Sequence, residues 1–157
     1  MNIIFGKIER LIILGGSWIT AALLKQLDGR ALEVLLYTSS RHYNEVVDDE
    51  GNTLKQVADL KGIESVVSEN INNDESIANA VTDNTLGLAM GAAWVFEPKT
   101  VALFNGRLLD LMGIALPQYR GGAHYTWQIL AGNKTGACNL QIIHGDEHTF
   151  HKGEIIK

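Results

Sequence analysis

Cysteine is almost absent from this chain, because Cys138 is the only one among 157 residues. A single cysteine cannot form an internal disulfide, so the sequence fits a reducing, cytoplasmic compartment better than an oxidising one. The neighbours Ala137, Asn139 and Leu140 are typical of a strand. Nothing near Cys138 in the sequence would activate the thiol as a nucleophile, so we expect it to be buried and unreactive.

The sequence also lacks an excess of positive charge and any long apolar run. Its 13 Lys and Arg residues are outnumbered by 18 Asp and Glu, and the formal net charge is −5. Nucleic-acid binding by phosphate neutralisation needs clustered basic residues, so no nucleic-acid partner is expected. No apolar run approaches the length of a membrane span, and the N-terminus lacks the pattern of a signal peptide. We therefore expect a protein that neither crosses nor enters a membrane.

What the sequence does contain is the composition and alternation of one α/β domain over residues 1–157. Hydrophobic residues make up 46% and charged residues 20%, enough to build a core. The expected strands are Leu11–Leu14, Leu32–Tyr37, Ser65–Val67, Gly87–Gly91 and Leu108–Met112. The expected helices are Trp18–Leu27, Thr53–Lys61, Asn73–Val81, Glu97–Phe104 and Tyr125–Ala131. This alternation predicts a three-layer fold with a mostly parallel, twisted sheet covered on both faces.

Two further segments complete the expected architecture. The polar stretch 38–52 is expected to be a loop or a poorly ordered helix. Ala137–Ile143 and Glu154–Ile156 are expected to form a late antiparallel hairpin. Ligands of open α/β sheets bind beyond the carboxyl ends of the strands, so we expect the site there.

A glycine pair follows the first expected strand. Gly15 and Gly16 precede Ser17, which can cap the next helix. Backbone N–H groups at such a helix start can hold an anion, but neither G-x-G-x-x-G nor a Walker motif is present. From these residues alone, a tight strand-to-helix turn and an anion site both stay open.

The most informative segment is Leu116-Pro117-Gln118-Tyr119-Arg120-Gly121-Gly122, followed by Trp127, Gly132, Thr135-Gly136 and Gly153-Glu154-Ile155-Ile156. This order resembles the folate-dependent formyltransferase family, which includes methionyl-tRNA, glycinamide-ribonucleotide and sugar N-formyltransferases. In that family, Leu-Pro-x-Tyr-Arg-Gly precedes a helix with Trp, a Thr-Gly strand and Asp-x-Gly-Asp/Glu-Ile. The resemblance is strongest over Leu116 to Gly136. It extends upstream to Gly91–Lys99, which resembles the stretch lining the folate pocket, and to the opening Gly15-Gly16 turn.

The resemblance implies a co-substrate, 10-formyltetrahydrofolate, and an acceptor that is a small amine such as an amino sugar nucleotide. The residues it implies for folate binding are Gly91, Ala92, Trp94, Val95, Leu116 and Pro117. Those it implies for substrate binding are Gly15, Gly16, Ser17, Tyr119, Arg120, Gly121 and His124. The last of these, His124, is better explained as the cap of the helix that follows it than as a substrate contact. Trp94 and Trp127 are expected to serve mainly as core residues.

The family's catalytic triad is substituted at every position. A His takes up the proton of the attacking amine, an Asp orients that His, and an Asn donates to the developing oxyanion. By position, the Asn corresponds to Asp110, the His to Met112 and the Asp to His151. An ionised Asp110 has no N–H to donate, and Met112 has no titratable proton. Ordinary formyl transfer by this route should therefore be very slow.

Two interpretations of His151 stay open. It can face Asp110 as a reversed acid–base pair, or it can belong to a solvated polar hairpin with His144, Asp146, Glu147 and His148. No metal site is expected, because Gly145-Asp146 favours a turn over a helix that would align His144 with His148.

Three functions follow from the resemblance. The first is formyl transfer to a small amine. The second is a catalytically inactive accessory domain that binds folate or a nucleotide, and the third is hydrolysis of the formyl group. The chain stops at Lys157, where family members continue with more helix and sheet, so we expect a catalytic domain shortened at its C-terminus. It also lacks the added domain of tRNA-directed members, so tRNA is not an expected substrate.

Overall fold

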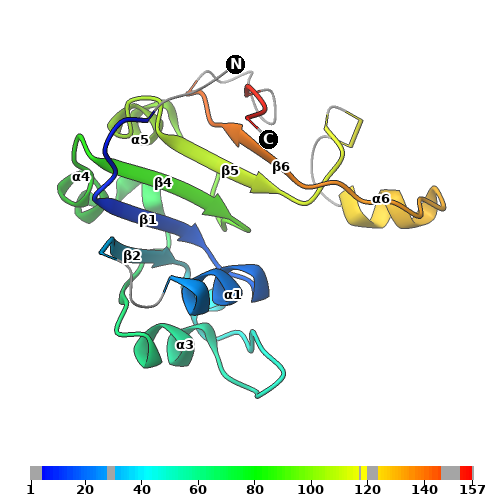
Figure 1. Cartoon of the computed structure of the whole chain (residues 1–157), viewed down its shortest axis with the longest axis horizontal. Coiled ribbons are helices and arrows are strands. Elements are labelled where there is room, and N and C mark those ends of the chain that lie inside the picture. The colour runs from blue at the N-terminus through cyan, green and yellow to red at the C-terminus, as the bar shows by residue number, and fades with distance from the viewer. Residues whose placement is uncertain (1–4, 28–30, 117, 120–123, 146–152, 157) are drawn as a thin grey trace.

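The computed structural model describes residues 5–27, 31–116, 118–119, 124–145 and 153–156 (Figure 1). They form a six-stranded sheet with the spatial order β3-β2-β1-β4-β5-β6. The strands are β1 (Arg10–Gly15), β2 (Glu33–Thr38), β3 (Glu64–Val67), β4 (Thr85–Met90), β5 (Leu108–Met112) and β6 (Asn139–Ile142). The first five strands are parallel, and β6 runs antiparallel to β5. The predicted, mostly parallel sheet with a late antiparallel pair is confirmed.

Helices cover both faces of this sheet. They are α1 (Trp18–Gln26), α2 (Ser40–Tyr43), α3 (Leu54–Leu60), the 3₁₀ turn η1 (Ile71–Asn73), α4 (Glu75–Ala80), α5 (Pro98–Leu103) and α6 (His124–Leu130). Successive residues of β1 point to opposite faces, as the strand period requires. Ile13 packs with Leu24 of α1 in one core cluster, whereas Ile12 packs with Val101 of α5 in the other. The fold therefore has the three predicted layers.

Side-chain caps fix the starts of the predicted helices. Ser17 accepts a hydrogen bond from the backbone N–H of Thr20 at the start of α1. Thr53 and Gln56 form a reciprocal capping box at the start of α3. Pro98 occupies the first turn of α5, where its missing N–H has no intrahelical partner to lose. The helices α1, α3 and α5 thus begin within one residue of their predicted starts, whereas α4 begins at Glu75, two residues after the predicted Asn73.

The polar stretch 38–52 is more ordered than a loop. Ser39 caps the short helix α2, and the backbone of Val46 pairs with that of Thr53 in an isolated bridge. Between them, Asp48 accepts hydrogen bonds from the backbone N–H groups of Glu50 and Asn52. Short polar side chains that hydrogen-bond local backbone groups build such turns. The stretch was expected to be a loop or a poorly ordered helix, and it contains the short helix α2 together with these turns.

The C-terminal third departs from the predictions in three ways. Trp127 is 62% exposed, because α6 extends away from the sheet and both core clusters (Figure 1). Cys138 is exposed as well, since it ends the exposed segment 131–138 before β6. The predicted last strand is reduced to one bridge between Gln141 and Ile155. Among the described residues, no helix has the length and apolar character needed to cross a membrane.

Candidate functional site

The described candidate residues gather at the carboxyl ends of neighbouring strands. Gly15-Gly16-Ser17 follows β1, and Gly91 to Val95 follow β4, which pairs with β1. Asp110 and Met112 lie near the end of β5, which pairs with β4. Since parallel strands end at the same edge, three segments far apart in sequence meet where an open α/β sheet binds its ligands.

Backbone contact between the first two segments requires glycine. Gly15 has a φ of +138°, and a Cβ there would overlap the carbonyl oxygen of Met90. Gly91 has a φ of +61° and lies against the backbone of Gly16. Only glycine adopts these conformations without strain, so the turn after β1 and the end of β4 form one rigid unit.

A pocket of about 550 Å³ opens beside this unit. It is lined by Gly16, Ser17, Ser39, Arg41, His42, Glu45, Gly91, Ala92 and Ala93. The N-terminus of α1, the hydroxyl groups of two serines and the guanidinium of Arg41 favour negative charge here, whereas the carboxylate of Glu45, 3.7 Å from Nε of Arg41, opposes it. Ser39 and Arg41, which follow β2, thus lie beside the glycine turn and add to the anion site predicted there.

His42 is a buried titratable member of this pocket, with 8% of its surface exposed. Its Nε2 lies 3.1 Å from Nη2 of Arg41. A guanidinium only donates, so Nε2 accepts and Nδ1 carries the proton of the neutral ring. Burial, followed by the charge of Arg41, lowers the pKa of His42. Its buried Nδ1 has no hydrogen-bond partner among the described residues, so the ring leaves one donor unused.

Asp110, which the sequence resemblance places at the position of the family's Asn, is paired across the sheet with Gln141 of β6. Nε2 of Gln141 donates to Oδ2 of Asp110 across 3.1 Å. Met112 is half-buried and lies opposite Asn139. The residue predicted to face Asp110, His151, lies outside the described residues, so the reversed acid–base pair stays a prediction.

The segment after β4 is held from the side by Asn72. The Asn72 side chain donates to the carbonyl of Val95 and accepts from the backbone N–H of Glu97, both at 2.9 Å. Trp94 is half-buried and packs against the core cluster that contains Leu108, which confirms a core role for it. Its indole N–H is buried without a partner among the described residues.

These features fit a planar ligand with polar edges. Asp110 and Gln141 lie on the sheet face of Leu108, since residues two apart on a strand share a face. The unused indole N–H of Trp94 belongs to the segment packed on that same face. Because that N–H is buried, Asp110 is the polar group that this face presents to a ligand.

The remaining candidates lie beyond β5. Leu116 is half-buried, and the hydroxyl of Tyr119 accepts from Nδ2 of Asn133. Of the described residues that line the pocket beside Gly16, none comes from this region. Pro117, Arg120 and Gly121 lie outside the described residues. His124 is the first residue of α6, where its side chain is likewise not described.

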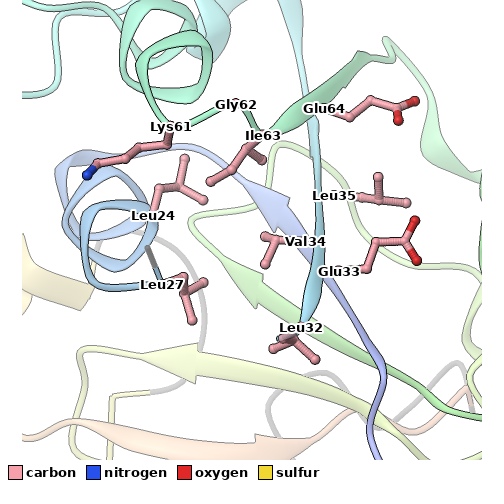
Figure 2. A pocket seen from close by; sticks show the side chains of 10 residues that line it. All are labelled: Leu24, Leu27, Leu32, Glu33, Val34, Leu35, Lys61, Gly62, Ile63 and Glu64. Atoms are coloured by element: carbon pink, nitrogen blue, oxygen red, sulfur yellow. The ribbon is translucent and has the colours of Figure 1, made fainter. Parts of the chain in front are cut away.

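A second pocket, of about 360 Å³, lies at the opposite end of the strands. Figure 2 shows Leu24 of α1 and Leu27, the residue after its end, facing Ile63 and the start of β2 across it. It is bordered by Lys61, Glu33 and Glu64 and contains none of the predicted site residues. Ligands of open α/β sheets bind at the carboxyl ends, so we place the functional site at the other pocket.

Sequence reasoning missed Arg41, His42 and Gln141. The first two fall within the polar stretch 38–52. Its position directly after a strand was the signal that could have indicated a place at the ligand-binding edge of the sheet. Gln141 had no such signal, because its importance depends on the register that pairs β6 with β5.

No protein-family model and no curated protein matches this chain. Solved structures do match it. Phosphoribosylglycinamide formyltransferase from Anaplasma phagocytophilum superposes with a TM-score of 0.69 at 18% identity, covering 96% of this chain and 70% of that one. An N-formyltransferase from Helicobacter canadensis, in complex with folinic acid and dTDP-3-aminofucose, gives a TM-score of 0.70 at 18% identity, covering 96% and 51%. A formyltetrahydrofolate deformylase from Pseudomonas syringae pv. tomato gives 0.72 at 13% identity, covering 98% and 51%.

These similarities establish the fold: the chain has the architecture of the folate-dependent formyltransferases over nearly its whole length. It spans about half the length of the Helicobacter and Pseudomonas proteins. The fold that the sequence resemblance implied is therefore confirmed.

Proposed function

We propose that this protein binds 10-formyltetrahydrofolate and transfers its formyl group to a small amine that carries an anionic group. The observation that carries the proposal is the meeting, at the carboxyl ends of β4 and β5, of the Trp94 segment and Asp110. It is supported by the fold, which is shared with enzymes whose names include formyl transfer to glycinamide ribonucleotide and to amino sugars.

The folate would lie along the segment after β4 and the loop after β5. The residues assigned to hold it are Gly91, Ala92, Trp94, Val95, Leu116 and Pro117. When bound, it supplies the formyl group. The Asn72 hydrogen bonds would keep the segment after β4 in place.

The acceptor would place its anionic group in the pocket beside Gly16 and Ser17. Arg41 adds a positive charge there, and the start of α1 adds backbone N–H groups. A phosphate-bearing amine such as an amino sugar nucleotide matches this chemistry. Gly15, Tyr119, Arg120, Gly121 and His124 complete the substrate-binding residues of the proposal.

Asp110 is the described group able to take a proton at the position of the family's triad. As the amine nitrogen bonds to the formyl carbon, its proton passes to the carboxylate, and a proton returns to the folate nitrogen as its bond to that carbon breaks. His151 facing Asp110 would make the reversed acid–base pair. Met112 cannot replace the His, so we expect a rate about 10²–10⁴ lower than with a catalytic His.

Two observations favour other outcomes from the same site. Met112 in place of an acid–base group favours an accessory domain that binds without turnover. The match to a formyltetrahydrofolate deformylase favours hydrolysis, in which water takes the place of the amine.

One set of measurements separates the three. Calorimetric titration with 5-formyltetrahydrofolate measures binding. Incubation with 10-formyltetrahydrofolate and matched amines, with and without a phosphate group, measures transfer by mass spectrometry. A formylated, phosphate-bearing amine supports the proposal. Binding without turnover supports the accessory domain, formate release without amine supports hydrolysis, and no binding refutes all three.

The proposed proton transfer has its own test. Asp110→Ala and His151→Ala are each expected to lower the transfer rate about 10²-fold or more. Asp59→Ala, on the exposed side of α3, serves as the control. A rate that is unchanged in both site variants would rule out the reversed pair.

A further inference from the structure

Gln141 is buried beside the proposed proton acceptor without an assigned role. Only 2% of it is exposed, and it lies on β6 directly opposite Asp110. Its side-chain amide donates to Oδ2 of Asp110 across 3.1 Å. A buried amide is costly unless it is hydrogen-bonded, so the contact with Asp110 is the feature that offsets its burial.

The orientation of the amide follows from the chemistry of its partner. An ionised carboxylate only accepts hydrogen bonds, so the NH₂ group of Gln141 must face Asp110. The carbonyl oxygen Oε1 then points elsewhere, and it is buried with no hydrogen-bond partner among the described residues. A residue selected for packing alone would be apolar here, because an unmet buried acceptor reduces stability. The hydrogen bond from Gln141 to Asp110 is therefore kept at a cost in the folding stability of the protein.

We propose that Gln141 is a positioning residue that holds the Asp110 carboxylate in the orientation that receives the proton of the acceptor amine. This inference rests on the proposed function. The residues beside Asp110 on the two neighbouring strands are Ala89 on β4 and Gln141 on β6. Ala89 offers no side-chain hydrogen bond and neither residue titrates, so the amide N–H is what the adjacent strands provide to fix the carboxylate.

The first test replaces the amide by an apolar side chain of similar length. Gln141→Met is expected to lower kcat about 10- to 100-fold, the scale of a misplaced catalytic group, and to leave KM within about twofold. The substitution removes a favourable hydrogen bond and, with it, the unfavourable buried oxygen Oε1. Because the two effects on stability oppose each other, the melting temperature should change by less than about 4 °C. Gln128→Met, at a buried glutamine of α6, is the matched control and should keep kcat.

The second test keeps the shape of the side chain and replaces its amide donor by a titratable carboxyl oxygen. Gln141→Glu places a second carboxyl group against Asp110, so the two groups repel or share one proton. The kcat of this variant at neutral pH is expected to fall further than that of Gln141→Met. Equal activity of Gln141→Glu and the unmodified protein would overturn the proposal.

A readout that needs no turnover separates this inference from the proposed function. Titration of the Asp110 carboxyl group by ¹³C NMR should show a higher midpoint in Gln141→Met, since a hydrogen bond to the charged form is lost. If the unmodified protein shows no turnover, the proposed function fails and the titration still tests the pair. An unchanged midpoint, or activity that falls only with the folded fraction, would show that Gln141 serves packing and would overturn the proposal.

Discussion

The central strands of the sheet and the helix α6, which follows β5, use their apolar side chains in opposite ways. Before β5, apolar residues of β1, β2, α1 and α3 fill two core clusters. After β5, α6 exposes Trp127, Ile129 and Leu130 at 62%, 75% and 72%. The same division runs through the site: the glycine turn and the pocket beside Gly16 are closely packed, whereas the sequence resemblance predicts that the triad positions on the later strands are substituted. We therefore propose that ligand binding is preserved more fully than the chemistry of the family.

The largest expected effect tests the packing side of this comparison. Leu36 is fully buried and Leu130 is 72% exposed. Leu36→Ala should cost about 2–5 kcal/mol of unfolding free energy, because it leaves a cavity, and Leu130→Ala should change it by about 0.5 kcal/mol or less. Urea unfolding measures both. Similar losses in the two variants would show that α6 is as well packed as the sheet.

The next effect concerns the glycine turn. Gly15→Ala places a Cβ against the Met90 carbonyl at a positive φ and should cost about 2–4 kcal/mol. Gly136→Ala is the control, since nothing lies within 4 Å of its added Cβ. Unfolding free energies compare the two. An unaffected Gly15→Ala would mean that the turn is less constrained than the structure indicates.

A smaller effect is expected in the pocket beside Gly16. Arg41→Gln should raise KM for a phosphate-bearing amine about tenfold, which corresponds to about 1.4 kcal/mol. Its kcat should change little. Arg107→Gln, ahead of β5 at the amino ends of the strands, controls for the loss of one positive charge. Equal KM values for the two variants would exclude an anion site at Arg41.

The smallest expected effect is a dependence of folding stability on pH in the acidic range. Hydrogen bonds from Lys25 and Asn52 lower the pKa of Asp48 from 3.8 to about 2. Because the folded-state pKa is the lower one, the stabilisation is complete above about pH 4 and is lost as the pH falls toward 2. Thermal melts across this range should fall less steeply for Asp48→Asn. Identical slopes would show that the loop contributes nothing to acid sensitivity.

The fold could be predicted from the sequence because the local signals agree with one another. Ser17, Thr53 and Pro98 mark helix starts, and apolar runs mark buried strands. The burial predicted for Trp127 and Cys138 was wrong, since the apolar character of a side chain does not determine whether a neighbouring element covers it. Strand order and register bring three further residues to the site, namely Arg41, His42 and Gln141. Order and register are tertiary properties that local spacing does not encode.

The central claim is that folate binds at the carboxyl ends of β4 and β5. Backbone amide NMR during titration with 5-formyltetrahydrofolate tests it most directly. The account predicts saturable shifts at Ala92, Trp94, Asp110 and Gln141. Shifts confined to Leu27, Leu32 and Ile63, around the pocket at the amino ends of the strands, or no shifts at all, would contradict it.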